Sequence, residues 1–110
     1  MNERDRFGLT ERDRKTLTDI FKKYPSVKEV RIFGSRAKGA FKLGSDIDLA
    51  IMNTGVNDRE FFSMKSDFED STLPYKVDIV NYPKLSHDEF IEHIDRVGIL
   101  FYKRDSLQSV

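Results

Sequence analysis

Segments with the period of a helix alternate along this chain with segments that have the period of a strand, and this alternation limits its fold more than any other feature. Leu17 and Phe21 recur at helical spacing until Pro25 ends the run, and Val27–Phe33 then alternates with a period of two. The same reasoning predicts helices at about 10–24, 57–73 and 86–97, a short turn or helix start at 36–42, and strands at about 27–33, 46–52, 75–81 and 99–102.

This order predicts an α/β (α+β) fold in which a small mixed β-sheet of three to four strands is flanked by helices. We expect one domain over residues 1–110, with its core at about 27–81 and flanking helices at about 10–24 and 86–97, followed by a polar tail. Ser86–Glu89 matches a capping box and marks the start of the last helix.

Composition excludes several classes of protein. The chain has 110 residues and no cysteine, so disulfides, thiolate metal sites and cysteine nucleophiles are ruled out. Its apolar stretches are a few residues long, far from the roughly 20 that a membrane span needs, and its N-terminus has no apolar segment typical of a signal peptide. We therefore expect a cytoplasmic protein. Its 19 basic and 19 acidic residues balance, which disfavours binding to long nucleic acid.

The first candidate site is a glycine-containing turn between a strand and a short basic segment. Gly34 lets the backbone approach an anion, and Ser35 offers a hydroxyl donor beside the N–H groups of a helix start. Arg36, Lys38 and Lys42 add positive charge. The turn therefore fits a phosphate site, although the same residues also fit a tight turn with solvated basic side chains.

The second candidate is a pair of aspartates in one strand. Asp46 and Asp48 are two residues apart, so both side chains project from the same face, while Ile47, Leu49 and Ile51 occupy the opposite face. Two neighbouring carboxylates repel each other, and a divalent cation with oxygen ligands relieves that repulsion. The alternative is an amphipathic strand whose polar face meets water.

A third acid lies in a later strand. Asp78 stands within the apolar run 77–80, where a buried carboxylate is costly unless it is paired or bound to a metal. An exposed position near the sheet edge would explain it equally well on its own. The three features together are more specific, because the glycine–serine turn, the Asp-x-Asp strand and the single later Asp follow one another in a recurring order.

In this order and spacing, the stretch from Val27 to Asn81 resembles the nucleotidyltransferase superfamily typified by DNA polymerase beta, and residues 34–39 and 45–51 resemble its minimal nucleotidyltransferase branch. The resemblance implies a polymerase-beta-like fold and transfer of a nucleoside monophosphate, with ATP the usual donor, to a hydroxyl with release of pyrophosphate. Gly34 and Ser35 would hold the triphosphate, with help from Arg36 and Lys38.

The metal set is implied by the same resemblance. Asp46 and Asp48 would bind Mg²⁺, with two ions expected, and Asp78 would complete the site near the attacking hydroxyl. His87 and His93 lie outside this constellation and are expected to be surface residues of the last helix without a role in it.

The minimal branch is known for its pairing with helical HEPN-type toxins, so the resemblance implies an antitoxin that adds AMP to such a partner. From the length of the chain we expect no acceptor-binding domain within it, and we expect another chain, or a dimer of this one, to present the acceptor. Two alternatives stay open. One is adenylylation of a small molecule such as an aminoglycoside with a separate subunit, and the other is a non-catalytic module that neutralises a partner by binding. A nucleic-acid polymerase fits less well.

Overall fold

The computed structural model describes residues 3–42 and 44–104 and contains a four-stranded mixed sheet with strand order β3-β2-β1-β4. The strands are β1 (Glu29–Phe33), β2 (Ile47–Ile51), β3 (Val77–Asn81) and β4 (Ile99–Lys103). The helices are α1 (Glu11–Lys22), α2 (Gly34–Lys38), α3 (Asp58–Glu69) and α4 (Asp88–Val97), with a 3₁₀ turn η1 (Tyr82–Lys84). The predicted fold class and element order are confirmed. The predicted polar tail lies outside the described residues beyond Arg104.

Sheet pairing places the two acid-bearing strands side by side. β2 pairs with β1 in antiparallel register and with β3 in parallel register, and β4 adds to the other side of β1. The parallel pair requires a crossover, which α3 supplies between β2 and β3. Phe33 therefore lies opposite Asp48, and Asp48 lies opposite Asp78.

Side-chain caps start the three longer helices. Thr10 and Asp13 form a complete capping box at α1, as Asn57 and Glu60 do at α3. The prediction for α4 is wrong in detail, because the cap is His87 rather than Ser86. The Phe90 N–H donates to His87 Nδ1 at 3.2 Å, so the imidazole satisfies the first-turn donor that a serine hydroxyl was expected to satisfy.

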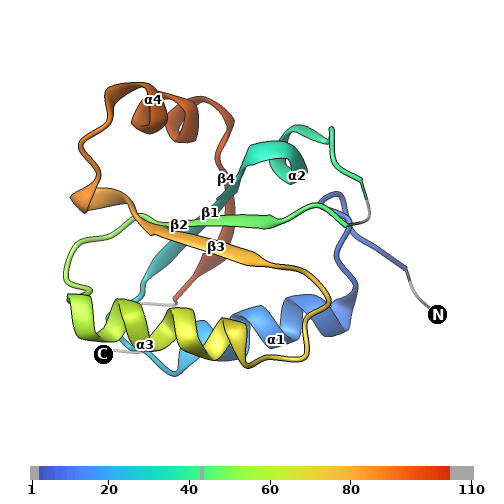
Figure 1. The fold of residues 1–110 in the computed structure, drawn as a ribbon, viewed down its shortest axis with the longest axis horizontal. Coiled ribbons are helices and arrows are strands. Elements are labelled where there is room, and N and C mark those ends of the chain that lie inside the picture. Colours follow the sequence, from blue (N-terminus) through green and yellow to red (C-terminus); the bar gives the residue numbers. More distant parts are fainter. Residues whose placement is uncertain (1–2, 43, 105–110) are drawn as a thin grey trace.

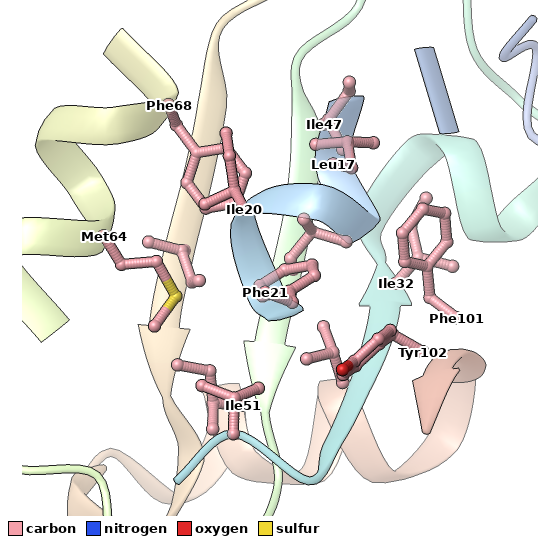
Figure 2. Close-up of a cluster of buried hydrophobic side chains, with 14 of the residues drawn as sticks. Leu17, Ile20, Phe21, Ile32, Ile47, Ile51, Met64, Phe68, Phe101 and Tyr102 are labelled. Carbon is pink, nitrogen blue, oxygen red and sulfur yellow. The ribbon is translucent and has the colours of Figure 1, made fainter. Parts of the chain in front are cut away.

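Helices cover the two faces of the sheet unequally. In Figure 1, α1 and α3 lie side by side below the sheet, and α4 lies above it. The lower face carries the main core, in which side chains of α1 and α3 pack on alternate residues of the strands (Figure 2). Phe21 is central to this core, because its ring contacts the rings of Phe68 and Tyr102 with centroids 5.4 Å apart in each case.

The upper face has a smaller apolar cluster. The strand period places Phe33 with Glu29 and Arg31 on this face, yet Phe33 is buried together with Ala50 and Ile94 of α4. The α4 helix covers this part of the face and makes it apolar. No described helix is long and apolar enough to cross a membrane.

Candidate active site

Asp48 and Asp78 are direct neighbours on the upper face of the sheet. They are partners in the parallel register of β2 and β3, so their side chains project to the same side. Asp48 is half-buried, whereas the side chain of Asp78 is 46% exposed and lies 3.7 Å from Lys76 Nζ. The fold thus brings together two acids that are thirty positions apart in the sequence.

The surroundings of Asp48 disfavour its negative charge. The pKa of Asp48 is raised to about 6, mainly by burial and then by the neighbouring carboxylates of Asp78 and Asp46. Arg36 acts in the opposite direction. A cation beside these carboxylates would relieve both the repulsion and the loss of solvation, so this electrostatic pattern favours a metal or another positive group.

The turn at Gly34 lies against the carboxylate of Asp48. Gly34 has φ +73°, a left-handed conformation that side chains rarely adopt, and a Cβ there would collide with Asp48 Oδ2. Glycine is therefore required for two reasons at this position. It permits the sharp turn from β1 into α2, and it leaves room for the carboxylate beside the backbone.

These residues open onto a pocket of about 470 Å³. One part of its lining consists of charged residues and Gly34, and the other part is aromatic and aliphatic. The lining residues are Phe33, Gly34, Asp48, Lys65, Asp78, Ile79, Val80, Phe90 and His93. A pocket of this size is suited to a small-molecule ligand.

The remaining predicted residues lie around this pocket rather than in its lining. Asp46 is exposed one residue before β2, Ser35 is half-buried in α2, and Lys38 is exposed at the end of α2. Across the described parts of the chain, no group of three or more His, Asp or Glu side chains is drawn together in an arrangement that could hold a metal ion. The carboxylate oxygens of these residues, and the repulsion that Asp46 and Asp78 exert on Asp48, nevertheless suit a hard cation such as Mg²⁺.

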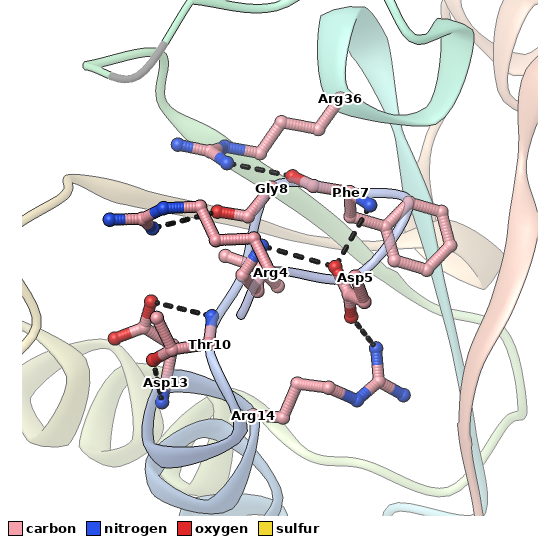
Figure 3. A network of polar contacts seen from close by, with 9 residues as sticks. Arg4, Asp5, Phe7, Gly8, Thr10, Asp13, Arg14 and Arg36 are labelled. Carbon is pink, nitrogen blue, oxygen red and sulfur yellow. Dashed lines mark hydrogen bonds and ion pairs between the residues drawn. The ribbon is translucent and has the colours of Figure 1, made fainter. Parts of the chain in front are cut away.

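Arg36 is placed differently from its expected role at a phosphate. It is 1% exposed, and its Nη1 donates to the Phe7 carbonyl at 2.7 Å (Figure 3). Its Nε and Nη2 donate to the Ser45 carbonyl at 3.2 and 2.8 Å, and its guanidinium lies over the rings of Tyr75 and Phe41. These contacts hold together the segments that precede Asp46 and Asp78, so Arg36 supports the site by fixing its flanking segments.

The N-terminal segment around Phe7, whose carbonyl accepts a hydrogen bond from Arg36, is itself held in place. Asp5 Oδ1 accepts from the N–H groups of Phe7 and Leu9, and Asp5 Oδ2 pairs with Arg14 at 2.6 Å (Figure 3). The Phe7 carbonyl is thereby fixed as an acceptor. The contact between Arg36 and this carbonyl was not foreseen from the sequence, since it joins residues 29 positions apart.

Sequence reasoning also missed the α4 side of the pocket. His93, which was expected to have no role, lines the pocket with Phe90. The two are three residues apart on one helix and therefore share a face, which is a signal that the sequence does contain. Lys65 of α3 also reaches the lining near Asp78, and no sequence pattern indicated this.

The fold and the acidic pocket together define a nucleotidyltransferase-type domain, and comparison with known proteins gives the family. The profile of the family described as "Polymerase beta, Nucleotidyltransferase" matches residues 15–107, so the chain belongs to this family. A Haemophilus influenzae protein named "Probable protein adenylyltransferase MntA" is 37% identical over 76 residues, which span 66% of this chain and 64% of that protein. The chain thus matches a little under two thirds of that relative's length.

Solved structures have the same fold. A toxin–antitoxin complex with AMP-PNP superimposes with a TM-score of 0.67 at 17% identity, covering 88% of this chain and 78% of that one. A complex of a tri-AMPylated Shewanella oneidensis HEPN toxin with its MNT antitoxin gives a TM-score of 0.57 at 17% identity, covering 86% and 76%. At these identities the likeness establishes the fold.

Proposed function

We propose that this protein is a Mg²⁺-dependent nucleotidyltransferase that moves AMP from ATP to a hydroxyl group of a HEPN-type partner toxin, and that it acts as the antitoxin. The observation that carries the proposal is the cross-strand pairing of Asp48 and Asp78 beside the Gly34 turn, within a chain of the polymerase beta nucleotidyltransferase family. The choice of partner is supported by the MntA-named relative and by the toxin–antitoxin complexes that share the fold.

Each acid has a place in this chemistry. Asp46 and Asp48 would hold Mg²⁺ with Asp78, and when bound the metal supplies positive charge that stabilises the transferring phosphoryl group and the leaving pyrophosphate. Asp78, whose side chain is partly exposed, would orient the acceptor hydroxyl. The acceptor oxygen then bonds to the α-phosphorus, the α–β bridging bond breaks, and the hydroxyl proton passes to a neighbouring carboxylate or water.

The phosphates would lie along the turn between β1 and α2. The Gly34 backbone is open to close approach, the Ser35 hydroxyl can donate to a phosphate oxygen, and the exposed Lys38 can add charge at the outer end. Arg36 contributes indirectly by fixing the Ser45 carbonyl, one residue before Asp46. The chain's own share of catalysis is therefore positioning together with electrostatic stabilisation.

The experiment is transfer of labelled AMP, read by intact-mass spectrometry of both the protein and the partner encoded beside it. Wild type with Mg²⁺ and ATP is expected to add AMP units to the partner, and Asp46→Asn/Asp48→Asn is expected to add none. Asp19→Asn is a matched control, because Asp19 is an exposed acid of α1 paired with Lys15 on the opposite side of the sheet. Transfer to an aminoglycoside, or neutralisation of the partner without any mass gain, would contradict the proposal and support one of the two alternatives.

A further inference from the structure

We propose that the aromatic wall of the pocket, formed by Phe33, Phe90 and His93, binds the base of the nucleoside triphosphate. This inference rests on the proposed function and adds to it the place where the donor's ring lies. It assigns a role to three side chains that neither the sequence motifs nor the acids account for.

The wall is built from two elements around one ring. Phe33, the last residue of β1, contacts Phe90 with ring centroids 5.6 Å apart and an interplanar angle of 76°. It contacts His93 at 6.1 Å and 81°. Both α4 side chains thus meet the Phe33 ring edge to face, which fixes their orientation while they still line the pocket.

The wall directly continues the acidic part of the pocket. Phe33 precedes Gly34 in the chain and lies opposite Asp48 in the sheet, and Val80 follows Asp78 by two residues on the same face of β3. An apolar surface and an acidic, metal-suited surface therefore share one cavity of about 470 Å³. A nucleoside triphosphate suits both parts, because it carries a flat aromatic base at one end and a polyanion that binds metal at the other.

His93 provides polar groups at this wall. Among the described residues its ring contacts Phe33 and has no hydrogen-bond partner, so its nitrogens can meet a polar edge of the base. A half-buried ring of this kind also offers a face for stacking, and stacking of a base on an aromatic side chain contributes about 1–3 kcal/mol.

The test compares two ligands that differ in whether they carry a base. Binding of Mg·ATP and of Mg·tripolyphosphate is measured by calorimetry for wild type, His93→Ala and Phe90→Leu. The leucine keeps an apolar side chain against the cluster around Ile94. We expect His93→Ala to weaken Mg·ATP roughly tenfold, with Phe90→Leu in the same direction, and both to leave Mg·tripolyphosphate within about twofold of wild type.

Controls separate the possible failures. Phe62→Ala removes a ring that is 61% exposed on α3, outside this pocket, and should change neither affinity. Equal weakening of both ligands by His93→Ala would show a general structural effect, and unchanged Mg·ATP affinity would show that the wall does not hold the base; either result overturns the inference. If His93→Ala and Phe90→Leu raised only the KM for the acceptor, the wall would bind the acceptor rather than the base, and the inference would again be overturned. If wild type itself bound neither Mg·ATP nor Mg·tripolyphosphate, the proposed function would be contradicted together with this inference.

Discussion

The two faces of the sheet differ in role: the lower face packs the main core, and the upper face carries the candidate site. On the lower face, Ile47, Leu49 and Ile51 of β2 are fully buried against α1 and α3. On the upper face of the same strand, Asp48 and Ala50 alternate with them, and α4 covers Ala50 while Asp48 opens onto the pocket. Because a strand changes face at every residue, five positions of β2 serve both packing and chemistry.

The contrast shows how a short chain tolerates clustered acids. The lower face carries the larger of the two apolar clusters, so most of the apolar burial that stabilises the sheet lies there. The upper face can then keep adjacent carboxylates whose repulsion raises the pKa of Asp48. The predictions below test whether stability and chemistry can be altered separately.

Removing the central acid should give the largest effect. Asp48→Asn removes the proposed metal ligand and its charge while keeping the size of the side chain. We expect AMP transfer to fall roughly a thousandfold or more, because metal-based stabilisation of a transferring phosphoryl group is worth several kcal/mol. Initial rates measure the loss, and circular dichroism checks that the fold is kept. Nearly normal transfer rates in this variant would show that the reaction does not depend on Asp48.

Breaking the lower face should affect stability. Phe21 is fully buried between Phe68 and Tyr102, so Phe21→Ala leaves a cavity that is expected to lower the free energy of unfolding by about 3–5 kcal/mol. Val80→Ala, at a half-buried position on the upper face, is expected to lower it by about 1 kcal/mol. Urea unfolding measures both values. Similar losses of unfolding free energy in the two variants would show that both faces contribute similarly to stability.

The contact between Gly34 and Asp48 can be isolated with a matched pair. Gly34 and Gly39 both have positive φ, so an alanine at either position should be strained by about 1–2 kcal/mol. An added Cβ meets Asp48 Oδ2 only at Gly34, while none of the described atoms lies near it at Gly39. Gly34→Ala should therefore lower transfer by roughly tenfold more than Gly39→Ala does. Equal transfer rates in the two variants would assign the effect to backbone strain alone.

The pH dependence of stability gives the smallest expected effect. The pKa of Asp48 is raised in the folded protein, so its contribution is fully present below the ordinary aspartate pKa and is lost as pH rises through about 6. Without metal, wild type should lose about 1–2 kcal/mol relative to Asp48→Asn between about pH 4 and pH 7, after allowance for partial exposure. Denaturation at several pH values measures the difference, and added Mg²⁺ should diminish it. A pH-independent difference between the two proteins would contradict the assigned burial of Asp48.

Local patterns made much of this structure predictable. The caps at Thr10 and Asn57, the alternation in β2 and the order of the acidic motifs all depend on residues close in sequence. Pairings between distant segments were less accessible. Nothing near Arg36 indicates that it will be buried under the Phe7 and Ser45 carbonyls, because both acceptors are placed by the tertiary fold.

His93 illustrates the same limit on the functional side. Its position three residues after Phe90 predicts a shared helix face, but only the packing of α4 over Phe33 turns that face toward the acids. The burial of Phe33 has the same origin, since the strand period alone places it with Glu29 and Arg31. The sequence pattern therefore did not predict how α4 is placed on the upper face.

The most direct test of the central claim is a crystal structure with Mn²⁺ and a non-hydrolysable ATP analogue, read by anomalous scattering from the metal. The account predicts metal peaks bonded to oxygens of Asp48, shared with Asp46 and Asp78, and phosphates beside the Gly34 turn. Metal bound through the phosphates alone, without contact to these aspartates, would contradict it.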